Sequence, residues 1–180
     1  MKRIIGGIGV VGVMALGLTA CTQGTGASDS TAVTGGSTTS TTSTRAASAH
    51  IGQELIITHP SGYKFGVTVT QIIDPATSST QPPAGSRFVA AQISLDNAGS
   101  QSASGNVNNQ LTVIGSDSHP YSSSSVPIQN CSNFNSGQYT LSPGNVVTGC
   151  VAFQLPSSVT VASVKFVPNP GSVVGTWTNP

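Results

Sequence analysis

Apolar and polar residues alternate along several stretches of this chain, and this period of two limits its possible folds more than any other feature. Successive side chains of a β-strand point to opposite faces, so such a stretch predicts a strand that is buried on one face. The predicted strands cover residues 65–69, 89–95, 111–113, 147–155, 159–166 and 173–177. Turn-forming runs rich in Pro, Gly and Asn separate them, such as residues 81–85, 97–99 and 142–144.

No stretch shows the i, i+3, i+4 spacing of an amphipathic helix. Residues 50–180 have the size of one domain, and short strands separated by turns predict an all-β fold, namely an antiparallel β-sandwich. Trp177, near the end of the chain, is expected to fill the core rather than to form a platform for a ligand.

The N-terminus resembles a bacterial lipoprotein signal peptide over residues 1–20. Lys2 and Arg3 precede an uncharged apolar run over residues 4–17, and small residues lead into Cys21. This resemblance implies cleavage before Cys21, a lipid on its thiol, and attachment to the cell membrane facing outside the cytoplasm. The alternative is an ordinary cleaved signal peptide, which would leave Cys21 as a free thiol.

Residues 21–49 are predicted to consist of the lipidated Cys21 and a disordered, Ser/Thr-rich linker. Ser and Thr account for 15 of the 28 residues from 22 to 49, and the run over residues 37–44 contains nothing else. A segment with so few apolar side chains cannot bury enough surface to offset the entropy lost on folding.

Three cysteines are present, and Cys21 is assigned to the lipid. Cys131 and Cys150 are therefore expected to form a disulfide, the usual state of such a pair in an oxidising compartment. A pair of zinc thiolates is the alternative, but it lacks a second cysteine pair or nearby histidines. If Val151 and Phe153 face the core, Cys150 faces outward, and the disulfide ties the preceding loop to the outside of a sheet.

The charge balance argues against a nucleic-acid partner. Charged residues make up 6% of the chain, and without Lys2 and Arg3 it has four basic and five acidic residues. Binding to phosphates requires clustered Lys and Arg, and so does binding to anionic lipid head groups through a polybasic patch. We therefore expect contact with a membrane through the lipid anchor only.

Three segments together resemble a known family: residues 87–100 (RFVAAQISLDNAGS), 141–144 (LSPG) and 149–156 (GCVAFQLP). They are similar to the telokin-like, immunoglobulin-like family of exported bacterial lipoproteins of unknown function, which is itself related to a secreted immunogenic mycobacterial antigen. The resemblance covers about residues 50–177. It implies an immunoglobulin-like β-sandwich outside the cytoplasm, without an established catalytic activity and without functional residues to carry over.

An enzymatic or cofactor-dependent function is not expected. The sequence lacks the Gly-x-Ser-x-Gly motif of α/β-hydrolases, although a Ser-His-Asp triad could still be assembled from dispersed residues. Asp117 and His119 are weak metal-ligand candidates that His50 or His59 could complete. We favour a turn in which Asp117 caps the backbone before Pro120, and we predict no metal site and no cofactor.

Two Asn-rich segments, residues 106–110 and 130–135, are the best candidates for recognition. Clustered amides beside aromatic rings can bind sugars or peptide backbone, and a disulfide would preorganise the loop. Asn also favours turns for its own sake, which is the competing interpretation. We expect a non-enzymatic module that binds an envelope protein or glycan, or else a carrier of a small ligand or metal. The candidate recognition residues are Asn130, Asn133, Phe134, Asn135 and Tyr139.

Overall fold

The structure is a computed structural model that describes residues 46–58, 62–168 and 173–179. The predicted signal peptide, Cys21 and the linker up to residue 45 lie outside these residues. Strands are the main secondary structure of the described part, and loops and one helical turn connect them. The elements are β1 (Ala47–His50), β2 (Glu54–Thr58), β3 (Lys64–Ile73), β4 (Ser86–Asn97), β5 (Ala103–Asn106), α1 (Val107–Gln110), β6 (Leu111–Gly115), β7 (Pro120–Ser124), β8 (Gln138–Leu141), β9 (Val146–Pro156), β10 (Val161–Phe166) and β11 (Gly175–Thr178).

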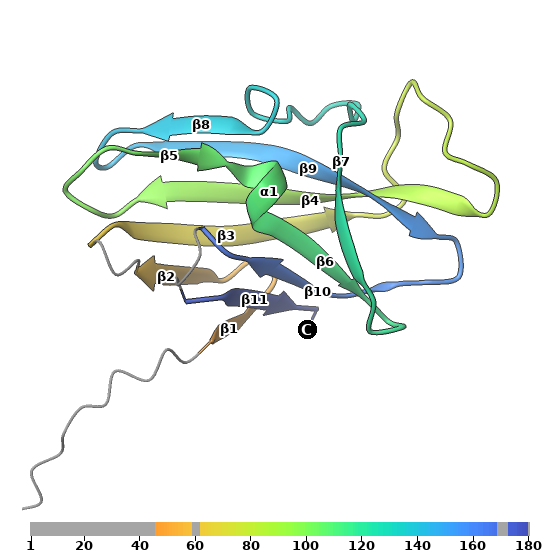
Figure 1. The fold of residues 1–180 in the computed structure, drawn as a ribbon, viewed down its shortest axis with the longest axis horizontal. Coiled ribbons are helices and arrows are strands. Elements are labelled where there is room, and N and C mark those ends of the chain that lie inside the picture. Colours follow the sequence, from red (N-terminus) through yellow and green to blue (C-terminus); the bar gives the residue numbers. More distant parts are fainter. Residues whose placement is uncertain (1–45, 59–61, 169–172, 180) are drawn as a thin grey trace, which may run out of the picture. The chain divides into compact units, whose positions relative to one another are not determined.

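The strands form a β-sandwich, as predicted (Figure 1). The order of hydrogen-bonded strands is β1-β11-β10-β6-β7-β9-β4-β3-β2, with β5 and β8 as a separate pair. β7 joins the two layers because its first part pairs with β6 and its end, at Ser123 and Ser124, pairs with β9. All pairs are antiparallel except β1 with β11, which run parallel.

The core lies between the layers and contains the apolar face of each predicted strand. Val67, Val89 and Phe153 are fully buried there. Trp177 is also 0% exposed, and its indole Nε1 donates a hydrogen bond to the backbone oxygen of Gln53 at 2.9 Å. The expectation that Trp177 fills the core is therefore confirmed.

The folded domain starts earlier than residue 50, because β1 includes Ala47 and pairs along β11. α1 is a single turn where the sequence indicated an Asn-rich loop. Asn106 begins it by accepting a hydrogen bond from the backbone N–H of Asn108 at 2.9 Å, which is a typical N-cap. Within the described ranges, no helix is long and apolar enough to cross a membrane.

Candidate recognition site

The disulfide between Cys131 and Cys150 lies on the outer face of β9, as the strand register predicted. Val151 and Phe153 belong to the main core, whereas Cys150 belongs to a second apolar cluster with Ala76, Phe88 and Ala90. Cys150 is only 1% exposed because this cluster and the chain around Cys131 cover it. The disulfide therefore faces away from the main core but is not open to solvent at Cys150.

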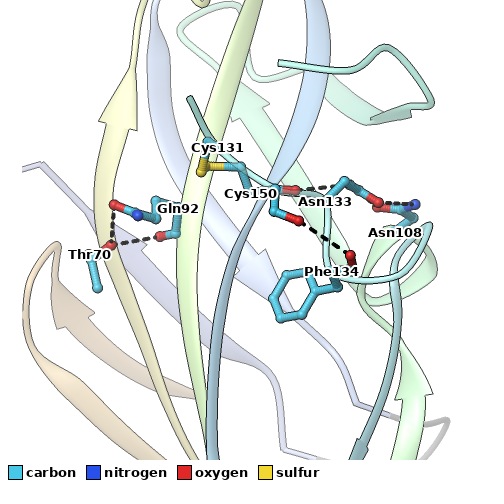
Figure 2. The surroundings of a disulfide bond; sticks show 8 residues. Thr70, Gln92, Asn108, Cys131, Asn133, Phe134 and Cys150 are labelled. Carbon is cyan, nitrogen blue, oxygen red and sulfur yellow. Dashed lines mark hydrogen bonds between the residues drawn. A yellow bond between two sulfur atoms is a disulfide. The ribbon is translucent and has the colours of Figure 1, made fainter. Parts of the chain in front are cut away.

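The two Asn-rich segments are joined to each other rather than presented separately. The side-chain amide of Asn133 donates to Oδ1 of Asn108 at 3.0 Å and to the backbone oxygen of Cys150 at 2.9 Å. The amide of Asn108 donates back to Oδ1 of Asn133 at 3.3 Å. Figure 2 shows the Asn133 side chain between Asn108 and Cys150. Asn133 is thus committed to holding the loop against β9 and α1, and both of its amide hydrogens are used.

Asn130 occupies a tight turn and does not join the other candidates. Ile128 and Cys131 form an isolated bridge, so Gln129 and Asn130 are the two residues between them. Asn130 has a φ of 60°, a left-handed conformation that Asn adopts more readily than most residues. For this residue the structure favours the turn interpretation over the recognition one.

A second tight turn links the loop to β8. Asn135 and Gln138 exchange backbone hydrogen bonds around Ser136 and Gly137, which have φ values of 51° and 84°. Two consecutive residues with positive φ are typical of a type I′ hairpin turn. This turn reverses the chain so that Phe134 and Tyr139 come close in space.

Tyr139 belongs to the core and is only 6% exposed, which the sequence did not indicate. Its ring packs edge to face against Phe65 with 6.2 Å between centroids. Burial of the phenol raises the pKa of Tyr139, and a hydrogen bond with Gln110 opposes part of that shift. Tyr139 can therefore contact a ligand only through the small part of its surface that lines a neighbouring hollow.

Such a hollow exists between the loop, β8 and the start of β9, and we call it the β8–β9 depression. Its volume is about 340 Å³. Phe134, Asn135 and Tyr139 all line it, so the structure brings three of the five sequence candidates together. The lining residues are Ser132, Phe134, Asn135, Gln138, Tyr139, Thr140, Val147 and Thr148.

None of these lining side chains is charged, and their polar groups are amides and hydroxyls. The sequence did not indicate a further five site residues, namely Ser132, Gln138, Thr140, Val147 and Thr148. Gln138 and Thr140 lie on a strand of four residues that has too little alternation to be recognised. Val147 and Thr148 lie on a predicted strand, but nothing in the sequence indicates which edge of that strand faces a hollow.

The weak metal candidates Asp117 and His119 form a capped turn. Oδ1 of Asp117 accepts a hydrogen bond from the backbone N–H of His119 at 3.0 Å, and Oδ2 accepts one from the Tyr121 hydroxyl at 2.7 Å. Both hydrogen bonds lower the pKa of Asp117, and the bond with Tyr121 has the larger effect. His50 lies on β1 and His59 lies outside the described residues. Among the described residues no three His, Cys, Asp or Glu side chains gather as a metal site would require.

Arg87 and Asp74 form an ion pair that serves the fold. Nε and one terminal nitrogen of Arg87 donate to the two carboxylate oxygens at 2.6 and 2.7 Å. The same guanidinium donates to the backbone oxygens of Pro156 at 2.7 Å and Val159 at 2.8 Å. The hydrogen bond with Asp74 raises the pKa of Arg87. Arg87 therefore ties the ends of β3 and β4 to the turn after β9.

Together, the fold and the site define a small immunoglobulin-like β-sandwich with a disulfide on the outside of one sheet and an uncharged depression beside it. The model of a family described as Domain of unknown function (DUF4352) matches residues 61–174, more than half of the chain. The protein therefore belongs to this family, whose function is unknown. No curated protein matches its sequence.

Two crystal structures illustrate the similarity in fold. A secreted protein from Mycobacterium tuberculosis, MPT63, matches with a TM-score of 0.56 and 16% identity, covering 74% of this chain and 97% of that one. The yjhA protein from Bacillus subtilis matches with a TM-score of 0.50 and 14% identity, covering 73% and 100%. At such identities the similarity shows the fold alone. The expected resemblance to a secreted mycobacterial protein is confirmed at that level.

Proposed function

We propose that this protein is a lipid-anchored, non-enzymatic module on the outer side of the cell membrane, and that it binds an envelope protein or glycan through the β8–β9 depression. The observation that carries this proposal is the depression itself. It combines the partly buried ring of Phe134 with amide and hydroxyl groups, and a disulfide fixes the loop that forms one wall. A preorganised loop loses less entropy on binding, so modest contacts suffice for recognition.

Two further observations support the location outside the cytoplasm. The pattern of residues 1–21 is typical of lipoprotein export, and disulfides persist mainly in oxidising compartments. The M. tuberculosis protein of similar fold is described as secreted. The test of the anchor is metabolic labelling with a radioactive fatty acid: the label should enter the wild-type protein and not the Cys21→Ser variant, which should leave the membrane fraction. Equal labelling of both proteins would contradict lipidation at Cys21.

The binding function is tested by photo-crosslinking in intact cells. A photoreactive phenylalanine derivative placed at Thr140, on the rim of the depression, should capture a discrete partner. The same derivative at Ser157, an exposed residue after the far end of β9, serves as the matched control. A partner captured at both positions, or at neither, would contradict recognition through the depression.

The alternative of a small-ligand carrier has less support from the geometry. The β8–β9 depression and a hollow beside His50 and Thr178 measure about 340 and 420 Å³, within the roughly 300–1,000 Å³ of ligand pockets, but both are open to solvent and would not enclose a small ligand. The hollow beside Tyr63 and Phe65 is smaller, at about 130 Å³. The metal-carrier version would need Asp117, whose two carboxylate oxygens already accept hydrogen bonds within the turn.

A further inference from the structure

β9 has two edges, and the edge that faces away from β4 is paired over only part of its length. Near the middle of β9, Ala152 pairs with Ser124 of β7. Next along this edge, the backbone N–H of Cys150 donates to the oxygen of Ser132 at 2.8 Å, and its C=O accepts from the Asn133 amide at 2.9 Å. Even-numbered residues of β9 therefore direct their backbone groups to this edge.

Thr148 and Val146 are the next two residues in this series. In an antiparallel ladder, hydrogen-bonded and non-hydrogen-bonded pairs alternate. The backbone N–H of Asn97 donates to the oxygen of Asn145 at 3.0 Å, so the odd-numbered residues at this end of β9 bond to β4. Thr148 and Val146 must then direct N–H and C=O to the other edge, where nothing in the described part of the chain pairs with their backbone.

β8 presents a matching edge on the opposite side of the depression. The backbone N–H of Val107 donates to the oxygen of Gly137 at 2.9 Å, which fixes the odd-numbered residues as the ones that bond to β5. The backbone N–H and C=O of Gln138 point away from β5 and bond to Asn135. Thr140 is also even-numbered, so its backbone groups point to the same edge. Thr140 and Thr148 both line the depression, so unpaired strand edges border it on two sides.

The surfaces around this gap fit an extended peptide better than a flat or charged partner. Phe134, Tyr139 and Val147 supply apolar surface that could receive one side chain, and all three pack on the main core. Val146 belongs to the unpaired edge, and its side chain is 60% exposed. An unpaired edge with exposed apolar residues is a ready template for another strand.

We propose that an extended, uncharged peptide segment of the partner protein adds as a strand to the free edge of β9 at Val146 and Thr148. The peptide backbone exchanges hydrogen bonds with Thr148, and one apolar side chain of the peptide enters the depression against Phe134. Strand addition of this kind obtains affinity from main-chain hydrogen bonds and specificity from pockets for alternate side chains. The inference rests on the proposed function and narrows its partner from a protein or glycan to an extended peptide.

The test begins with the full chain, purified in detergent, and a phage library of random heptapeptides that lack Asp, Glu, Lys and Arg. The best enriched peptide is synthesised with and without N-methyl groups on its backbone. The matched protein variants are Thr148→Pro, which removes the backbone N–H at the free edge, and Thr148→Ala, which keeps it. Proline is tolerated at an edge when its nitrogen faces away from the ladder, so Thr148→Pro should fold.

We expect the synthetic peptide to bind the wild type and Thr148→Ala within a factor of about three of each other. Thr148→Pro and the N-methylated peptide should each weaken binding by roughly tenfold or more, the effect of a lost hydrogen bond of about 1.4 kcal/mol. The N-methylated peptide tests the other bond of the exchange, from the peptide N–H to the Thr148 C=O, on unaltered protein, whether or not Thr148→Pro folds. If no peptide is enriched, or if N-methylation leaves the affinity unchanged, strand addition is wrong.

A panel of neutral oligosaccharides distinguishes a failure of strand addition from a failure of the proposed binding function. An oligosaccharide that binds the wild type and loses affinity in Phe134→Ala, while no peptide is enriched, would overturn strand addition and leave the binding module intact. If the photoreactive derivative at Thr140 also captures nothing in cells, both proposals fail.

Discussion

The ring of Phe134 lies directly over the backbone of Gly149. A Cβ atom built on Gly149 would lie 2.7 Å from Cε2 of Phe134 and 2.7 Å from the backbone oxygen of Ser132. Only glycine therefore allows the loop to approach β9 closely enough for the backbone hydrogen bond between Cys150 and Ser132. The shape of the candidate site thus depends on a residue that has no side chain.

Gly149→Ala should destabilise the protein by about 1–3 kcal/mol, the usual range for overpacking. The clash involves a backbone oxygen, which cannot rotate away, so relief requires the loop to move. Urea unfolding measures the change, and Thr148→Ala, one residue away and exposed, is the control that should stay within about 0.5 kcal/mol of the wild type. An unchanged midpoint in Gly149→Ala would show that the loop does not lie against β9 in solution.

Replacing both Cys131 and Cys150 with alanine should cost about 3 kcal/mol, because the cross-link removes loop-closure entropy from the unfolded chain. The sequence separation of 19 residues gives a loop of moderate size. Thermal unfolding of the wild type with and without reductant provides the same comparison without a mutation. A double variant as stable as the oxidised wild type would contradict this account.

The fold was predictable because each long strand carries its own evidence in the sequence. Val89 and Phe153, for example, lie in alternating runs whose apolar faces are buried in the core. The sequence did not indicate β1, β2, β5, β7 and β8, because strands of four or five residues are too short to show a clear alternation of their own. β7 consists of Pro120 and four small or polar residues, yet it links the two layers.

The candidate site was predictable only in part, for a different physical reason. The alternation at Val151 and Phe153 placed Cys150 on the outer face correctly, because strand geometry determines which side a residue faces. The structural role of Asn133 could not be predicted, because its side chain bonds to Asn108, which is 25 residues away in the sequence. Tyr139 was placed in the recognition loop because the type I′ turn that returns it to the core was not recognised.

Asn97 is a buried amide that the sequence indicated only as part of a turn. It is 1% exposed, its Nδ2 donates to the backbone oxygens of Gln101 at 2.8 Å and Leu141 at 2.9 Å, and its Oδ1 accepts from Gly99 at 3.1 Å. Asn97→Ala should cost about 3 kcal/mol, since each buried group left without a partner costs about 1–3 kcal/mol. Asn109→Ala, at an exposed position on α1, is the control and should change stability little. Equal effects of the two substitutions in urea unfolding would contradict the role assigned to Asn97.

Tyr139 should make the protein less stable in alkali. Its pKa is raised in the folded state, so the unfolded state loses this proton first as the pH rises. The contribution of Tyr139 to the free energy of unfolding is therefore fully present below the ordinary tyrosine pKa of about 10, and it falls as the pH rises above that value. Tyr139→Phe should flatten the fall in urea stability above about pH 10. An alkaline decline as steep in Tyr139→Phe as in the wild type would contradict the assignment.

Hydrogen exchange along the start of β9 should alternate from residue to residue. Val147 and Gly149 have the odd parity that bonds to β4, so their amides should exchange slowly. Thr148 directs its amide to the free edge and should exchange at least about tenfold faster than either neighbour, whereas Cys150, bonded to Ser132, should again be protected. Exchange of the purified protein followed by NMR measures each amide separately. Uniform protection across residues 147–150 would mean that the edge is already paired in the free protein, and no strand could then add to it.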